Sequence, residues 1–222
     1  MAEVQIRCYE DGDEKDVKEI FALGLHGLLR SSCLHVLKQL HIQVLLVCVF
    51  CALLASTKSL LLPILAVTLL LAAGRQEICH MIDSYIEKSM SDDLRNIRQT
   101  YLEQPNSCLW VAEFQEQVVG MVACCPSERN KAWLELKRMS VRHSHRGQGI
   151  AKALCRAVEE FARKQSFPAV VLYTSVVQTD AQKLYECMGY KRDSGHVSSV
   201  VSSWITKFTV FEYMLDLQHP EN

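Results

Sequence analysis

The chain has 222 residues, with 24 basic side chains, 25 acidic side chains and a formal net charge of −1. This length suits one domain of ordinary size with an additional segment, and the lack of a basic surplus argues against a nucleic-acid partner. The ten cysteines are scattered and several lie in apolar runs, which is typical of reduced, buried thiols. We therefore expect no bound metal.

The N-terminal residues predict a strand followed by a helix. Residues 4–8 alternate between apolar and polar side chains, which indicates a strand. Asp11–Asp13 predicts a turn and the start of a helix, with acidic residues at its favoured end. The apolar face of that helix runs from Val17 to Leu25.

Two apolar runs come next, at residues 44–55 and 60–74, with 12 and 15 residues and no charge or amide. Pro63 is expected to break the second run. A signal peptide is not expected, because the first run begins late and follows a folded start. Each run is shorter than the roughly 20 residues of a full span. A single span, a hairpin with its tip near Lys58, a shallow re-entrant hairpin and a buried soluble helix pair stay open.

Topology favours the hairpin. If residues 4–8 and 134–141 join one sheet, both lie on one side of the bilayer, and the chain crosses it an even number of times. Cytosolic flanks carry an excess of Lys and Arg, and such residues flank both ends of the segment, at Arg30, Lys38, Arg75 and Lys88. We expect a membrane hairpin inserted within a cytosolic domain.

The following residues return to globular patterns. Residues 81–102 have helical spacing, and residues 91–93 are expected to cap a new helix there. Residues 108–113 and 118–125 predict two strands joined by a short turn. Nearer the C-terminus the pattern predicts a strand, a helix closed by Gly189, a polar loop and a last strand, at residues 169–174, 179–188, 194–203 and 208–217.

Residues 134–162 hold the pattern that carries chemistry. The alternation of a strand slips in register between Leu136 and Met139, which predicts a bulge. A glycine-rich segment and a helix follow. Backbone N–H groups at the start of a helix bind phosphate oxygens, and Gly147 and Gly149 let an anion approach the backbone without a Cβ in the way.

Three phosphate-loop patterns compete at this segment. The P-loop pattern G-x-x-x-x-G-K-[ST] does not occur, and a dinucleotide fingerprint needs a third glycine where Lys152 stands. The pattern R-x-x-G-x-A fits Arg146, Gly149 and Ala151. It resembles the acetyl-CoA loop of the GCN5-related N-acetyltransferases (GNAT). An ordinary tight turn before a helix is the alternative.

A second stretch, residues 178–190, resembles the signature N-x-x-A-x-x-L-Y-E-x-x-G-F of the same family, with Gln178 and Tyr190 in place of the usual Asn and Phe. Two motifs in the family's order imply the mixed α+β GNAT acyl-CoA acyltransferase fold with an inserted hydrophobic membrane hairpin. The chain then divides into the start of the catalytic domain, the insertion, the rest of the catalytic domain and a tail, at residues 1–34, 35–78, 79–217 and 218–222.

The position of the insertion is similar to that in the camello-like (N-acetyltransferase 8) subfamily of membrane-bound acetyltransferases. Members N-acetylate cysteine S-conjugates in the endoplasmic reticulum, others are reported to acetylate protein lysines in the secretory pathway, and the group name carries a link to cell adhesion during gastrulation. The resemblance implies an enzyme of the endoplasmic reticulum membrane that uses acetyl-CoA and a small-molecule amine. A protein lysine acceptor and a non-enzymatic membrane adaptor are the alternatives.

The resemblance also implies roles for residues that hold acetyl-CoA. The backbone of Met139, Ser140 and Val141 would pair with the pantetheine arm and polarise the thioester carbonyl. The loop that would hold the diphosphate consists of Arg146, Gly147, Gln148, Gly149, Ile150 and Ala151. Gln178 would make a further cofactor contact, and Arg142 is a candidate for added positive charge.

Catalytic roles follow from the same match. Tyr185 occupies the position of the family's general acid. A phenol with a pKa near 10 can give its proton to a thiolate whose conjugate thiol has a pKa of about 8.5. Glu135, which some relatives use as a base, and Glu113 are the candidate bases, although each alone is typical of a surface carboxylate. Lys137 or Arg138 would receive the carboxylate of a cysteine S-conjugate.

Overall fold

A mixed sheet organises the computed structural model, which describes residues 4–201 and 208–218. Within these residues the sheet has seven strands in the order β1-β2-β3-β4-β5-β7-β6. The strands are β1 (Gln5–Cys8), β2 (Cys108–Phe114), β3 (Gln117–Pro126), β4 (Leu134–Val141), β5 (Ala169–Ser175), β6 (Lys191–Val201) and β7 (Phe208–Asp216). Neighbouring strands are antiparallel except β4 and β5, which are parallel. The mixed α+β fold predicted from the two motifs is confirmed.

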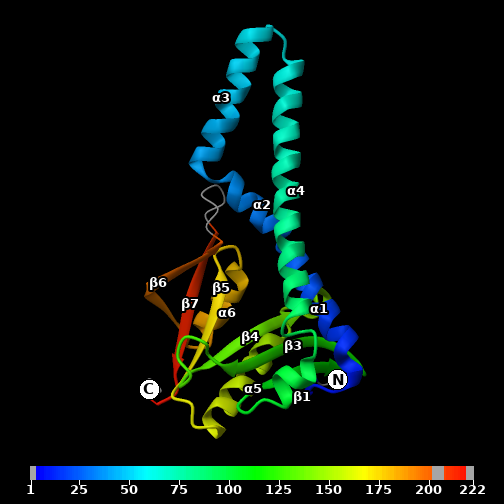
Figure 1. Cartoon of the computed structure of the whole chain (residues 1–222), viewed down its shortest axis with the longest axis vertical. Coiled ribbons are helices and arrows are strands. Elements are labelled where there is room, and N and C mark those ends of the chain that lie inside the picture. The colour runs from blue at the N-terminus through cyan, green and yellow to red at the C-terminus, as the bar shows by residue number, and fades with distance from the viewer. Residues whose placement is uncertain (1–3, 202–207, 219–222) are drawn as a thin grey trace.

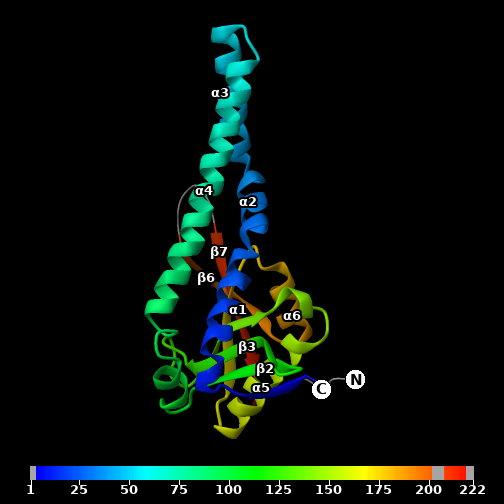
Figure 2. The same cartoon turned by 90° about the vertical axis from the view of Figure 1, so that its right-hand side faces the viewer.

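Helices cover the two faces of the sheet unequally (Figures 1 and 2). On one face, α5 (Ile150–Lys164) and α6 (Thr179–Cys187) close a core that extends from β2 to β7. On the other face, α1 (Glu14–His26) and the segment that includes the short π-helical turn Arg98–Leu102 pack on β2 and β3. The second core is smaller, and its sheet residues come from β2 and β3 and not from β5 or β7.

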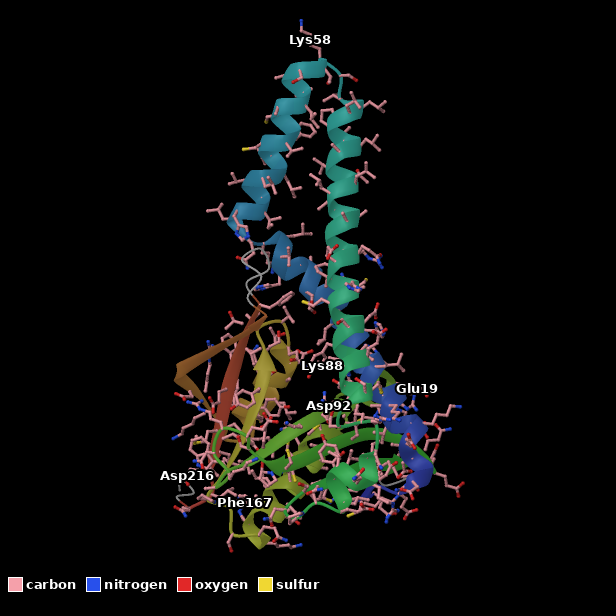
Figure 3. The ribbon with its side chains drawn as sticks, in the orientation of Figure 1. Glu19, Lys58, Lys88, Asp92, Phe167 and Asp216 are labelled. Carbon is pink, nitrogen blue, oxygen red and sulfur yellow. The ribbon has the colours of Figure 1, made fainter. Side chains whose placement is uncertain are left out.

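A pair of long helices projects from this domain (Figure 1). After α2 (Leu29–Leu37), the helices α3 (Leu40–Thr57) and α4 (Leu61–Ser91) form a helical hairpin. The turn between them contains Lys58 in the left-handed conformation, with φ of 52°, and this residue marks the tip farthest from the sheet (Figure 3). The hairpin with its tip near Lys58 is therefore observed, although the structure contains no membrane.

Three stretches of the described residues are long and apolar enough to cross a membrane: Asp11–Leu37, Leu40–Thr57 and Leu61–Ser91. The first of them includes α1, whose Val17, Ile20 and Phe21 are buried against the sheet. That burial makes α1 part of the core of the domain. Every residue of α3 is described, and none is buried.

Both ends of the helical hairpin return to one sheet. Residues 5–8 pair with 110–113 in antiparallel register, from Gln5 opposite Glu113 to Cys8 opposite Trp110. The first strand thus lies in the same sheet as β4, as the topology argument required. The chain leaves the domain after α1 and returns to it along α4.

Two sequence predictions near the helical hairpin are wrong. Pro63 does not break a helix, because it lies in the first turn of α4, where a missing N–H costs no hydrogen bond. Ser91 does not begin a helix; it ends the 31-residue α4, and its hydroxyl donates a hydrogen bond to the carbonyl of Lys88 at 2.9 Å. Serine near a helix end can make this backward bond as readily as an N-terminal cap.

The predicted polar loop at residues 194–203 is also wrong in its described part. Residues up to Val201 belong to β6, which pairs with β7 through two register shifts. An edge strand needs pairing on one side only, so small polar residues are compatible with it. Residues 202 and 203 lie outside the described residues.

Candidate active site

The parallel strands β4 and β5 separate in the middle of the sheet. Their pairing extends from Leu134 opposite Val170 to Leu136 opposite Leu172. Beyond that point β5 continues to Ser175 as a partner of β7. In the described chain, the edge of β4 that faces β5 has no strand partner after Leu136, so its backbone groups are available to a ligand that adds as an extended segment.

A bulge lies on β4 where the strands separate. Ala123 of β3 faces Lys137 and Met121 faces Ser140, so Arg138 and Met139 together occupy the space opposite one residue of β3. Arg138 has φ of 57°, which is costly for a residue with a side chain. The bulge predicted from the register slip is confirmed, and it re-aims the backbone at Met139–Val141.

The side chains of the bulge point to opposite faces. Met139 packs against the core beneath α5 and α6. The hydroxyl of Ser140 donates a hydrogen bond to the carbonyl of Ile20 at 3.1 Å, which ties β4 to α1. Val141 is buried in the same core as Met139. Because these side chains are engaged inside the protein, the backbone is what this segment offers to a cofactor.

The glycine-rich loop follows at the end of β4. Gly147 and Gly149 have φ of 77° and 82°, and a Cβ built on either would meet no atom within 4 Å. The Arg146 side chain folds back, with its Nε donating to the carbonyl of Val141 at 3.1 Å, and Gln148 is exposed. Helix α5 begins at Ile150, which is buried and anchors the first turn. The loop is thus an open backbone cradle at the positive end of a 15-residue helix.

This cradle fits the diphosphate of acetyl-CoA. The phosphate oxygens need several N–H donors and room for close approach, and both are present from Gly147 to Ala151. The gap beside β4 fits the extended pantetheine arm for the reasons given above. Bound acetyl-CoA would supply the acetyl thioester, and the chain's own part is to hold it, polarise its carbonyl and move protons.

Tyr185 lies on the face of α6 that packs against the sheet and α5. It is 5% exposed, and its ring lies 5.8 Å from that of Tyr190 and 6.3 Å from that of Tyr213. Burial raises the pKa of Tyr185, with a smaller contribution from the nearby Cys155 thiol. The phenol therefore keeps its proton at neutral pH, as a general acid must before it reacts.

Glu135 is buried in β4 and is not the surface carboxylate that its sequence context suggested. It is 8% exposed, and its Oε1 lies 3.5 Å from Nζ of Lys137. Burial raises the pKa of Glu135 more than Lys137 lowers it, so the carboxylate is more basic than a free one. The pKa of Lys137 is raised overall. Burial lowers it, but the neighbouring acidic groups, Glu135 foremost, raise it by more.

The second candidate base, Glu113, lies on β2, two strands away from β4. Its carboxylate accepts a hydrogen bond from Arg7 Nε at 2.6 Å. Arg7 also pairs with Asp13. Glu113 therefore stabilises the pairing of β1 with β2, and Glu135 is the carboxylate that lies beside the gap.

Two candidate arginines are engaged with helices. Arg142 binds Asp16 at 2.7 Å and Glu19 at 3.0 Å, so its guanidinium faces α1 and not the glycine-rich loop. Arg138 donates to both carboxylate oxygens of Asp93, at 2.6 and 2.8 Å. Neither is free to take the role that the sequence left open for it.

Arg138 is the centre of a network that the sequence did not reveal. Its guanidinium also donates to Tyr85 Oη at 3.2 Å and to Ser89 Oγ at 3.1 Å, both on α4, and lies 4.8 Å from the centroid of the Phe21 ring. Asp93 in turn accepts a short hydrogen bond from Tyr101. The base of α4 is therefore fastened to the bulge of β4.

Gln178 stabilises the turn that leads into α6. Its Oε1 accepts hydrogen bonds from the Ser175 amide at 2.9 Å and from the Thr174 hydroxyl at 3.3 Å. The oxygen is engaged within the chain, and the cofactor contact of Gln178 stays a prediction. The catalytic roles of Tyr185 and Glu135 also stay predictions. Tyr185 packs in the core beneath α5 and α6, and Glu135 lies on the opposite face of the sheet, one pair before β4 and β5 separate.

Known proteins match both the sequence and this geometry. Residues 76–190 match the Acetyltransferase (GNAT) family. The chain is 37% identical over 203 residues to N-acetyltransferase 8F1 of Mus musculus, covering 90% of this chain and 91% of that protein. It is 31% identical over 218 residues to Probable N-acetyltransferase camello of Xenopus laevis, covering 98% and 100%. The chain belongs to the GNAT family, in its N-acetyltransferase 8 and camello group.

Other matches widen the family. N-acetylaspartate synthetase of Danio rerio is 38% identical over 193 residues, covering 86% of this chain and 67% of that protein. Among solved structures, a PaiA N-acetyltransferase of Thermoplasma acidophilum in complex with coenzyme A has a TM-score of 0.58 at 13% identity and covers 95% of this chain and 98% of that one. An acetyltransferase of the GNAT family from Staphylococcus aureus Mu50 has a TM-score of 0.57 at 16% identity, with 97% and 99% coverage. At these identities the structures support the fold.

As a GNAT member, the chain is an N-acetyltransferase with acetyl-CoA as its co-substrate. The geometry agrees with this chemistry, because the open cradle and the separated strands lie in one part of the sheet. The acetyl group must reach an amine at the gap between β4 and β5.

Proposed function

We propose that this GNAT enzyme is bound to the endoplasmic reticulum membrane by its α3–α4 hairpin and acetylates the α-amine of cysteine S-conjugates on the cytosolic side. The observation that carries the membrane part is the exposure of the apolar side chains of the hairpin. Those at least half exposed include Leu40, Val44, Leu45, Val47, Leu61, Ile64, Leu65 and Leu69. Soluble proteins rarely expose apolar surface of this extent without a partner.

The dimensions of the hairpin suit a bilayer. The 18 residues of α3 extend over roughly 27 Å at the rise of an α-helix, close to the ~30 Å thickness of the hydrocarbon core. Lys58 at the tip would reach the far interface, because a long lysine side chain can extend its charge into water. Both helices return to one sheet, which requires the hairpin to enter and leave on the same side.

The acceptor is proposed from chemistry and from the names of relatives. N-acetylaspartate synthetase, a relative named above, is named for an acetylated amino acid. A cysteine S-conjugate is also an amino acid, with a lipophilic substituent that partitions into bilayers. A site at the base of an apolar hairpin suits such a substrate, since the substituent can remain near the membrane while the amine reaches the gap.

The direct test uses membranes from cells that express the chain, supplied with acetyl-CoA and S-benzylcysteine. We expect N-acetyl-S-benzylcysteine to form, and no product with the Gly149→Trp variant. No product from the wild-type chain would contradict the proposed substrate. Acetylation of lysine in peptides by the same membranes would favour the alternative, a protein lysine acetyltransferase of the secretory pathway.

The membrane arrangement has a separate test. We expect the chain to resist extraction by alkaline carbonate, and protease added to intact microsomes to digest the C-terminal strand β7. Release by carbonate would contradict membrane insertion. Protection of β7 would place the active site in the lumen, where acetylation of secretory proteins becomes the better proposal.

A further inference from the structure

A buried acid lies on the face of the sheet opposite α5 and α6. Glu212 of β7 is 2% exposed, whereas its neighbours Phe211 and Tyr213 point into the core beneath α5 and α6. Alternation along a strand therefore puts Glu212 on the opposite face, with Tyr173 of β5 directly beside it. A buried carboxylate needs a positive or hydrogen-bonding partner.

That partner is an arginine from a distant loop. Arg129, between β3 and β4, donates a short hydrogen bond to Oε2 of Glu212, and Tyr173 Oη lies 3.4 Å from Oε1. The loop is itself ordered by backbone bonds, from Ser127 to Trp133 and from Trp133 to Asn130, both at 2.9 Å. The arginine is thus fixed at both ends, by its loop and by Glu212.

The guanidinium keeps donors for another ligand. The side chain of Arg129 is 42% exposed, and arginine has five N–H donors in a planar fork. The recorded bond to Glu212 uses Nη1. The remaining edge of such a fork matches the two oxygens of a carboxylate.

Arg129 lies close to the point where β4 and β5 separate. Leu172 is the last residue of β5 that pairs with β4, and Tyr173, beside Arg129 and Glu212, is the next residue. Glu135 and Lys137 lie on the same face of β4, paired with Cys125 and Ala123. A small zwitterion on this face would therefore meet a fixed cation on one side and the buried Glu135 carboxylate on the other.

We propose that Arg129, held in place by Glu212, binds the α-carboxylate of an amino-acid acceptor and so directs its α-amine toward Glu135 and the gap between β4 and β5. This inference rests on the proposed function, because it requires an amino-acid acceptor. It makes Arg129 a specificity residue and Glu212 a positioning residue. Lys137, which the sequence suggested for the carboxylate, is instead paired with Glu135.

The experiment compares two acceptors that differ only in the carboxylate, S-benzylcysteine and S-benzylcysteamine. With the purified full chain in detergent, the wild type is expected to prefer S-benzylcysteine. Arg129→Gln should raise the KM for S-benzylcysteine by about 10- to 100-fold, as expected for the loss of a charge-assisted bidentate pair. The KM values for S-benzylcysteamine and acetyl-CoA should not change.

Matched variants separate binding from structure. Lys131→Gln removes an exposed cation from the same loop and should change neither KM. Arg129→Lys keeps the charge without the fork and should recover part of the preference, and Glu212→Gln should weaken it without abolishing it. An equal loss on both acceptors in Arg129→Gln would show a structural role and overturn the inference.

Two further outcomes are decisive. If Lys137→Gln removes the preference and Arg129→Gln does not, Lys137 binds the carboxylate and the inference is wrong. If the wild type acetylates both acceptors equally, no residue recognises the carboxylate and the inference is wrong. The proposed acetylation of S-conjugates would still hold. If it acetylates neither, the proposed substrate fails as well.

Discussion

The catalytic sheet and the α3–α4 hairpin are both rich in leucine and valine, but they bury these side chains differently. In the sheet region Leu154 is 0% exposed and packs in the core beneath α5. In the hairpin Leu65 is 52% exposed. The first region supplies its own apolar environment, whereas the second needs one from outside the chain, which is the physical basis for proposing a bilayer there.

The comparison also separates where chemistry and anchoring lie. Every candidate catalytic group is on the sheet or on the helices that pack against it, and the hairpin meets these groups through a polar network at its base. Residues Tyr85 and Ser89 of α4 bind Arg138 at the bulge of β4. The two regions are therefore joined at the edge of the active site.

The largest effect on activity should come from removing the hydroxyl group of Tyr185, which packs against the sheet. Tyr185→Phe removes the phenol proton but retains the ring that packs against Tyr190 and Tyr213, so the fold should persist. We expect kcat to fall by about 1,000-fold, within the range for loss of a general acid, with the KM for acetyl-CoA unchanged. Steady-state kinetics measure this. The matched variant Tyr190→Phe should retain activity, and wild-type kcat in Tyr185→Phe would exclude the acid role.

Next, the same substitution should destabilise the fold in the sheet region and have no effect on it in the hairpin. Leu154→Ala leaves a cavity in the core and should lower the free energy of unfolding by about 3 kcal/mol. Leu65→Ala should leave unfolding of the catalytic domain unchanged, because no side chain of that domain depends on it. Denaturant unfolding in detergent measures both. A comparable loss in Leu65→Ala would mean that the hairpin is packed within the protein.

The junction between the regions should be sensitive to charge. Asp93→Asn leaves the Arg138 guanidinium buried without its ion, which should cost about 3 kcal/mol. We expect the KM for acetyl-CoA to rise as well, because the bulge at Met139–Val141 loses its support. The double variant Asp93→Asn with Arg138→Gln should recover part of the stability. Unchanged melting temperature and unchanged KM in Asp93→Asn would show that the network is dispensable.

The smallest predicted effect concerns Glu135 and pH. Because burial raises the pKa of Glu135 in the folded chain, its ionised form is disfavoured by folding. Glu135→Gln should therefore match the wild type in stability below the ordinary pKa of about 4.3, and become the more stable protein as the pH rises through the folded pKa. Melting temperatures between pH 4 and 8 measure this.

The activity of Glu135→Gln should move in the other direction. We expect kcat/KM at neutral pH to fall about tenfold or more, with loss of the acidic limb that a carboxylate base produces. Glu113→Gln, which removes a carboxylate far from the gap, is the control. A retained acidic limb in Glu135→Gln would show that another group accepts the proton.

Much of the fold follows from local sequence. The register slip between Leu136 and Met139 predicted the β4 bulge, and Gly189 marked the end of α6, where its φ is 89°. Local signals gave wrong predictions where a residue type is compatible with two structures. Serine occurs at the end of a helix as well as at its start, so Ser91 was misassigned, and a proline such as Pro63 is compatible with the first turn of α4. Pairing with β7 made β6 a strand despite its polar sequence.

The site was harder to predict than the fold. The glycine loop and Tyr185 lie in short motifs, so their resemblance to the family's motifs was enough to single them out. Arg138 with Asp93 and Arg129 with Glu212 are separated by 45 and 83 residues, and nothing in local spacing links such partners. Their contacts arise from the order of strands in the sheet, which only the folded chain reveals.

The central claim is that backbone N–H groups at the start of α5 bind the diphosphate of acetyl-CoA, and isothermal titration calorimetry tests it most directly. Wild-type protein in detergent should bind acetyl-CoA, and Gly149→Trp should not, because the indole fills the open space at that glycine. Gly12→Trp is the matched control, since a Cβ there also meets nothing within 4 Å and the position lies outside the site. Equal affinity of the wild type and Gly149→Trp for acetyl-CoA would contradict the account.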